Sequence, residues 1–291
     1  MKYQTSTKST ALARLSLTAQ HLHLSRCSST SATPDIIPIN QGTKFTPDYT
    51  NYATTPNGKI VSYFHDIALN LNKETREANM VVEIPRWTNA KFEINTKTPG
   101  NPIVQDIKKG KPNTKHHGLF GDNDPLDVCE IGSKILSTGD VRRVKILGSI
   151  ALIDDGELDW KVIVINVHDP LFKEVNDIND LDEKCPGLLD TTRQWFRDYK
   201  LADGKPQNDF AFNGEYKNAN ETIDIIEQCH KSWQQLINGE TKTDKTPDIT
   251  NTTVKGSPGF TDTISVSLNN PSRANAAIPV DVEANYFIKT S

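Results

Sequence analysis

The chain has 291 residues, of which 35% are hydrophobic and 24% are charged, and its formal net charge is −4 at pH 7. This length and composition predict a globular protein with a sizeable core, and no run approaches the ~18–20 consecutive apolar residues that a membrane helix needs. The acidic balance argues against nucleic-acid binding, which requires a basic surface.

The first 34 residues differ in composition from the rest of the chain. They contain four basic residues, many Ser and Thr, and no acidic residue. If they form a helix, one face carries the apolar side chains of Leu12, Leu15, Ala19 and Leu22. Basic, hydroxyl-rich and amphipathic leaders are typical of organellar transit peptides, so residues 1–34 are predicted to be a mitochondrial transit peptide. A disordered tail is the alternative.

Short runs rich in β-branched residues follow between residues 59 and 167, and turn sequences such as PNG, TPGNP, GDNDP and DDGELD separate them. Many short strands with such punctuation predict a β-barrel or a β-sandwich. After His168 the pattern becomes helical. The segment NDINDLDEK predicts a short helix, PGLLDTTRQWFRDYK a longer helix that Pro186 opens, and residues 221–237 a third helix with apolar residues at helical spacing.

The C-terminal part changes character again. From residue 240 a polar stretch with Pro and Gly predicts an exposed tail, although the last segment, AAIPVDVEANYFIKTS, regains apolar residues. The chain is therefore divided into a leader (1–34), one domain (35–239) and an extended C-terminal tail (240–291).

The segment GDNDPLDVCEIG concentrates three carboxylates at a turn before a strand, those of Asp122, Asp124 and Asp127. Like charges repel one another unless water screens them or a cation lies among them. A calcium EF-hand loop is excluded, because such a loop needs a ligand at its fifth position, Gly at its sixth and Glu at its twelfth. For the motif taken alone, a surface Asx turn is the alternative.

Two further segments add carboxylates and lysines. DDGELDWK contains Asp154, Asp155, Glu157, Asp159 and Lys161, and VVEIPRWTNAKFEI contains Glu83, Lys91 and Glu93. Hard divalent cations prefer carboxylate oxygens, and Mg²⁺ keeps water molecules that bridge to phosphate. Carboxylates with lysines beside them therefore predict a site for several Mg²⁺ ions and a phosphate ligand.

These segments resemble the soluble family I inorganic pyrophosphatases of the fungal and animal type. GDNDPLDV matches the Asp-x-Asp-Pro-x-Asp signature of that family, and NMVVEIPRWTNAKFEI, GELDWKVI, NDIND, PGLL, WFRDYK and DGKPQNDFAF are similar to its other segments. The resemblance covers residues 58–239, and the leader adds a likeness to the mitochondrial member.

This resemblance implies Mg²⁺-dependent hydrolysis of pyrophosphate to two phosphates. The fold it implies is mainly β with helices (α+β), a small five-stranded closed, OB-like β-barrel with peripheral helices. It also implies a homodimer, and the transit-like leader places the protein in the mitochondrial matrix. The charge and the apolar pattern described above predict that no nucleic acid is bound and that no segment spans a membrane.

The resemblance further implies a role for each matching residue. Asp124 would accept the proton of the attacking water. The metal ligands would be Asp122, Asp127, Asp154, Asp159 and Glu93. The phosphate oxygens would be bound by Lys91, Lys161, Tyr199 and Lys200. Glu83 would support the network of metals and water.

One part of the family pattern is missing. Family members carry a longer stretch between the KKGK turn and the acidic signature, with an arginine and a tyrosine that bind phosphate, whereas here only Leu119 and Phe120 separate HHG from GDNDP. By family comparison roughly thirty residues are absent, including barrel backbone that pairs with neighbouring strands. An error in the gene model, a shortened isoform and a diverged protein are the alternatives. The last would be a non-catalytic metal- or phosphate-binding or structural homologue.

Overall fold

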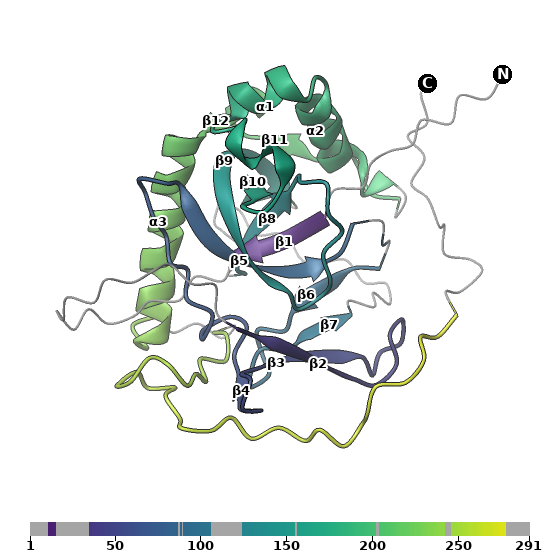
Figure 1. Ribbon diagram of the computed structural model, residues 1–291, viewed down its shortest axis with the longest axis vertical. Coiled ribbons are helices and arrows are strands. Elements are labelled where there is room, and N and C mark those ends of the chain that lie inside the picture. Colours follow the sequence, from purple (N-terminus) through teal and green to yellow (C-terminus); the bar gives the residue numbers. More distant parts are fainter. Residues whose placement is uncertain are drawn as a thin grey trace.

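The computed structural model describes residues 35–86, 88, 90–105, 124–154, 156–201, 204–241 and 246–277, together with the backbone of residues 11–15. The strands of these residues form two sheets, and helices lie around the larger one (Figure 1). The predicted fold class, mainly β with helices, is confirmed. None of the helices in these ranges is both long and apolar enough to cross a membrane.

The larger sheet contains the long hairpin of β9 and β10. Its strands are β1 (Ala11–Leu15), β5 (Glu77–Ile84), β8 (Leu126–Glu130), β9 (Val141–Asp154), β10 (Glu157–Asn166), β11 (Asp209–Phe210) and β12 (Lys217–Asn218). The strands pair in the order β10–β8–β1–β5–β9, β9 pairs again with β10, and β11 and β12 lie on β9. Each of the strands β10, β8, β1, β5 and β9 therefore pairs with two others of this set, and the last pairs with the first. That these strands form a closed five-stranded barrel stays a prediction.

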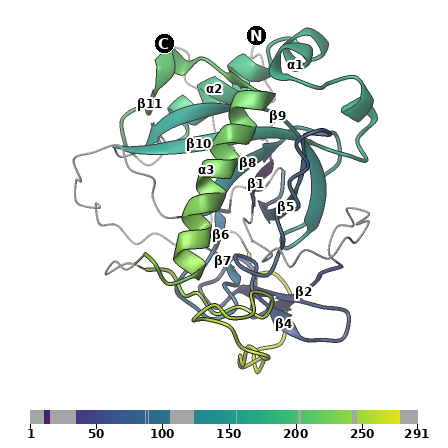
Figure 2. The ribbon, with the colours of Figure 1, turned by 90° about the vertical axis from the view of Figure 1, so that its left-hand side faces the viewer.

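Strand β9 is buried along almost its whole length, because other parts of the fold cover both of its faces. Helix α3 (Ala219–Ile237) lies across the sheet in Figure 2, and it contacts β9. At Gly148 a side chain would collide with the backbone carbonyl of Lys217 on β12, so glycine is required there for β12 to pair. The mostly apolar stretch of residues 146–153 in β9 reflects this two-sided burial.

The three predicted helices are confirmed as α1 (Ile178–Lys184), α2 (Leu188–Asp198) and α3. Helix α3 begins with a capping box, in which the Asn218 side chain accepts from the Glu221 amide at 3.0 Å and the Glu221 carboxylate accepts from the Asn218 amide at 3.1 Å. The ring of His230, which is partly buried on this helix, stacks on Trp233 with ring centroids 5.5 Å apart.

The smaller sheet consists of β2 (Ile37–Gln41), β3 (Thr50–Thr54), β4 (Ile60–Val61), β6 (Phe92–Ile94) and β7 (Ile103–Gln105). Of the short runs predicted to be strands between residues 59 and 167, the first (residues 59–67) is a strand only at Ile60–Val61. Directly after it, the Ser62 hydroxyl accepts from the amides of Phe64 and His65 at 3.1 and 2.8 Å. A local side-chain bond of this kind offers the backbone a turn in place of a ladder.

Two predictions about the termini are corrected. The helical face predicted for the leader is wrong for residues 11–15, which form strand β1, because hydrogen bonds to two neighbouring strands outweigh the weak stability of a short helix. The exposed tail is wrong for residues 247–264, which run along the smaller sheet (Figure 1) with Asn251 and Val254 buried, whereas residues 265–277 include no buried residue. The Asp66 carboxylate accepts from the Thr252 amide and the Thr253 hydroxyl, each at 2.8 Å.

Candidate active site

Strands β8 and β10 bring three of the predicted residues together. The two strands are parallel, and Asp127 on β8 lies opposite Lys161 on β10. Asp159 precedes Lys161 by two residues and therefore points to the same side of β10. The Lys161 ammonium donates to the carboxylates of both Asp127 and Asp159. We call these three residues the central group.

Lys161 is a buried, permanently charged group. Only 5% of the residue is exposed. Burial lowers the pKa of its ammonium, but the two neighbouring carboxylates of Asp127 and Asp159 raise it more, so the pKa lies above its ordinary value. The site therefore holds a fixed positive charge against two carboxylates that remain partly accessible, with 18% and 16% of their side chains exposed.

A second group of predicted residues lies where α2 ends near the β9–β10 hairpin. The Tyr199 hydroxyl donates to the Asp154 carboxylate at 3.2 Å, and the Lys200 ammonium pairs with the same carboxylate. Burial raises the pKa of Tyr199, and the negative charges of Asp154 and Asp159 raise it further, against an opposing effect of Lys161. Tyr199 therefore experiences the charges of both groups.

Two aromatic residues that sequence reasoning did not single out support these groups. The Lys161 ammonium lies 5.7 Å from the centroid of the Phe196 ring. The Trp195 ring stacks on the Tyr199 ring at a centroid distance of 5.1 Å and an interplanar angle of 16°. The spacing of four residues between Trp195 and Tyr199 is the available sequence signal, because such residues share a helix face.

Glu83, Lys91 and Glu93 lie where the two sheets meet. Glu83, on β5, is 2% exposed, and its carboxylate accepts from the Ile94 amide of β6 at 2.6 Å. Lys91 directly precedes β6, and its ammonium lies 2.7 Å from the carboxylate of Glu93 on that strand. Glu83 thus fixes β6 against β5, and a common site for Glu93 and the central group stays a prediction.

The acidic turn itself is described only in part. Asp124 is exposed on the bend that precedes β8, three residues before Asp127, and Asp122 lies outside the described residues. No group of three or more His, Cys, Asp or Glu residues that could hold a metal ion occurs among the residues with described positions. Asp127 and Asp159 nevertheless face one shared cation, the Lys161 ammonium, and their carboxylate oxygens are donors that suit Mg²⁺.

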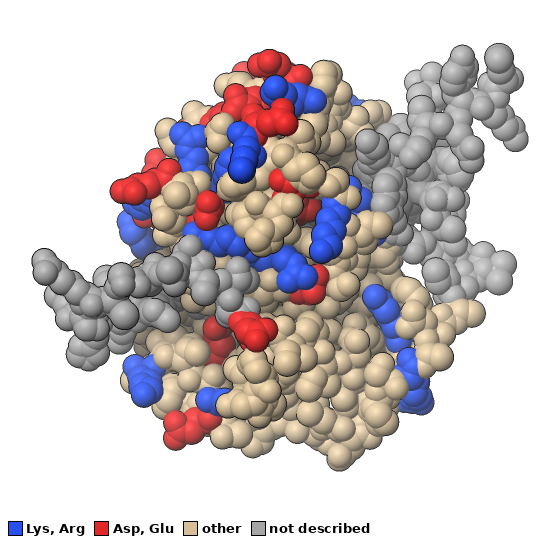
Figure 3. Space-filling view, in the orientation of Figure 1, with Lys and Arg blue, Asp and Glu red and all other residues tan. Residues whose placement is uncertain are grey.

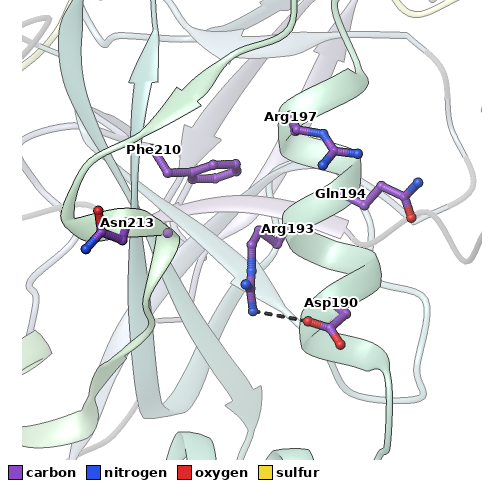
Figure 4. Close-up of a pocket in the computed structure, with 7 residues that line it drawn as sticks. Asp190, Arg193, Gln194, Arg197, Phe210 and Asn213 are labelled. Atoms are coloured by element: carbon purple, nitrogen blue, oxygen red, sulfur yellow. Dashed lines mark hydrogen bonds and ion pairs between the residues drawn. The ribbon is translucent and has the colours of Figure 1, made fainter.

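The space-filling view shows where charge gathers on one face. Lys, Arg, Asp and Glu side chains crowd its upper half, over α1, α2 and the larger sheet, whereas the lower half is mostly uncharged (Figure 3). A pocket of about 550 Å³ lies on α2, lined by Asp190, Arg193, Gln194, Arg197, Phe210, Asn213 and Gly214 (Figure 4). It contains none of the predicted site residues, and its Arg193 and Asp190 already pair at 3.1 Å.

Comparisons with known proteins identify the family of the chain. The family model described as inorganic pyrophosphatase matches residues 80–234. The mitochondrial inorganic pyrophosphatase of Saccharomyces cerevisiae is 43% identical, with 86% of this chain and 88% of that protein covered. An inorganic pyrophosphatase of Candida albicans is 46% identical, with coverages of 85% and 96%. The solved inorganic pyrophosphatase of Schistosoma japonicum superimposes with a TM-score of 0.74 at 38% identity, with coverages of 86% and 99%.

The comparison with the yeast protein also reveals a shortfall in length. The match extends over 282 residues but covers 86% of this 291-residue chain, which is about 250 residues. The difference of about 32 residues between 282 and 250 is similar in size to the stretch that the family resemblance implies is missing before the acidic turn.

Proposed function

The chain belongs to the inorganic pyrophosphatase family, and we propose that it hydrolyses pyrophosphate to two phosphates at the central group of Asp127, Asp159 and Lys161. The observation that carries this proposal is the buried Lys161 ammonium between two partly accessible carboxylates. Such a site combines ligands for a hard cation with a fixed positive charge for an anionic substrate.

Mg²⁺ is the proposed cofactor. The residues proposed to hold it are the carboxylates of Asp122, Asp127, Asp154, Asp159 and Glu93. When bound, Mg²⁺ lowers the pKa of a coordinated water and neutralises charge on the phosphates. The pair of carboxylates that share the Lys161 ammonium supports this assignment, because they already face a single positive charge.

The remaining residues are proposed to bind substrate and move a proton. Asp124, exposed on its bend, accepts the proton of the attacking water. Lys161, Lys200 and Lys91 bind phosphate oxygens and offset the charge of the leaving phosphate. Tyr199, which donates to Asp154 at 3.2 Å, turns its hydroxyl to a phosphate oxygen when substrate is bound.

Glu83 has a supporting role in this proposal. Its carboxylate is nearly fully buried and accepts from the backbone of β6, the strand that carries Glu93. A fixed β6 holds Glu93 at one position relative to β5.

We also propose that the protein acts in the mitochondrial matrix as a homodimer. The composition of residues 1–34 and the similarity to the mitochondrial enzyme of yeast support this location. Fractionation of cells that express the tagged full chain tests it, and a cytosolic signal alone would contradict it. Light scattering of the purified chain tests the dimer, and a mass near 32.4 kDa would indicate a monomer.

A phosphate-release assay tests the function. The full chain should release phosphate from pyrophosphate with Mg²⁺ present and release none with excess chelator. Asp124→Asn should reduce the rate by about 10²–10⁴, the usual contribution of general base catalysis. Asp190→Asn is the matched control, because this carboxylate is 81% exposed on α2 and should leave the rate unchanged. A full chain that folds and releases no phosphate with Mg²⁺ would contradict the proposal.

The length shortfall favours a second candidate, a non-catalytic homologue that binds metal or phosphate. Removal of one positioned donor to a phosphoryl group typically costs about 10²–10³ in rate. Calorimetry that detects Mg²⁺ or phosphate binding without turnover would favour this candidate, and measurable turnover would exclude it.

A further inference from the structure

The leader contributes a strand to the middle of the larger sheet. Strand β1 lies between β5 and β8 and pairs with both in antiparallel fashion. On one side Leu12 lies opposite Ile84 and Ala13 opposite Val82. On the other side all five residues of β1 pair, from Ala11 opposite Glu130 to Leu15 opposite Leu126. In Figure 1 this purple strand crosses the centre of the sheet.

Without β1, two strand edges face each other across a gap. β5 pairs on its other side with β9, and β8 pairs on its other side with β10, so neither has another partner at these positions in the described sheet. These edges lie in the core, where Val82 and Val128 are fully buried. Buried backbone N–H and C=O groups that lack hydrogen-bond partners destabilise a fold, and open strand edges pair with other chains.

The gap adjoins the place where the chain is short. The family resemblance implies that the missing backbone lies directly before the acidic turn, which leads into β8. The length shortfall against the yeast protein amounts to about 32 residues, from 282 against 250. We propose that Ala11–Leu15 serves as the strand that this shortened chain otherwise lacks, and that the leader remains part of the folded enzyme.

The proposal assigns the leader a role beyond targeting. A chain cleaved before Asp35 lacks β1 and exposes the facing edges of β5 and β8. Retention of the leader keeps the circuit of pairings complete through β1. Import into mitochondria must then precede folding, because a paired strand is not available as an extended presequence.

Hydrogen exchange of the unmodified full chain tests the proposal without any activity readout, so its outcome is independent of the proposed function. Amides of a strand paired on both sides exchange slowly, whereas those of an unpaired leader exchange at the rate of a free peptide. The result expected is exchange of the residue 11–15 amides slowed by at least about a hundredfold relative to a synthetic peptide of residues 1–34. Equal rates in the chain and in the peptide would overturn the proposal.

A proline variant tests the consequence for the neighbouring strands. Ala13→Pro removes an amide from the middle of β1, a position that a central strand does not tolerate. Exchange should accelerate at least about tenfold in residues 81–84 and 126–130, and the pairing of β9 with β10 should keep residues 157–163 protected. Ser28→Pro, in the leader outside β1, is the matched control.

Both outcomes of the variant are informative. If Ala13→Pro fails to fold while Ser28→Pro folds, the result supports the proposal, and so does accelerated exchange in an Ala13→Pro chain that folds. If Ala13→Pro folds with unchanged exchange at both edges, β1 does not hold them and the proposal is wrong.

Discussion

Replacement of Lys161 by methionine tests how the central group is stabilised. Lys161→Met keeps the length of the side chain and removes the ammonium that Asp127 and Asp159 share. Loss of one partner of a buried ion pair costs about 3–5 kcal/mol. The side chains of Asp127 and Asp159 are 18% and 16% exposed, so water hydrates their carboxylates in part. We therefore expect a loss at the lower end of that range, about 3 kcal/mol of unfolding free energy.

The assay is urea unfolding at pH 7, with and without Mg²⁺. Mg²⁺ should stabilise Lys161→Met more than the unmodified chain, because a divalent cation offsets the repulsion of the exposed carboxylate pair. Lys91→Met is the control, since the Lys91 side chain is 46% exposed and its pairing with Glu93 should contribute less than about 1 kcal/mol. A loss below about 0.5 kcal/mol in Lys161→Met, with no added response to Mg²⁺, would refute the reasoning.

Three further predictions concern the rest of the fold and site. Tyr199→Phe removes the hydroxyl that donates to Asp154. We expect the rate of phosphate release to fall about tenfold and the free energy of unfolding in urea to fall by about 1 kcal/mol. Unchanged turnover would contradict a contact between Tyr199 and the substrate. Burial lowers the pKa of His65 to about 4, so the unfolded chain takes up a proton first as the pH falls. Stability should therefore drop by about 3 kcal/mol between pH 6.5 and pH 4 and stay level above pH 6.5, and His65→Gln should flatten that slope. Asp66→Ala leaves the Thr252 amide without its acceptor, so residues 246–277 should be cut faster by protease, with about 2 kcal/mol lost; an unchanged cleavage rate would contradict this docking.

Strong periodic patterns made most of the fold predictable. The apolar run of β9, the alternation in β8 and the helical spacing of α3 each reflect burial that local sequence reports directly. Tertiary pairing decided the rest. Strand β1 depends on two edges supplied by β5 and β8, and the docked C-terminal segment depends on Asp66, which lies almost 190 residues away from Thr252.

The site divides in the same way. The acidic segments and their lysines predicted a metal and phosphate site, and the family resemblance implied that Asp127, Asp159 and Lys161 belong to it. The two-residue period of β10 accounts only for Asp159 and Lys161 pointing to one side, whereas their meeting with Asp127 depends on the parallel pairing of β8 with β10. The support from Phe196 and Trp195 was not predicted, since an aromatic residue on a helix packs into any core. Whether Glu93 joins the central group depends on how two sheets pack, which spacing along one strand does not report.

Diffraction from crystals soaked with Mn²⁺, an anomalous scatterer that replaces Mg²⁺, tests the central claim most directly. The account predicts metal peaks within about 2.5 Å of the Asp127 and Asp159 carboxylates, with the Lys161 ammonium moved away from between them. Well-ordered crystals with manganese bound elsewhere, or with Lys161 still bridging both carboxylates and no peak beside them, would contradict it.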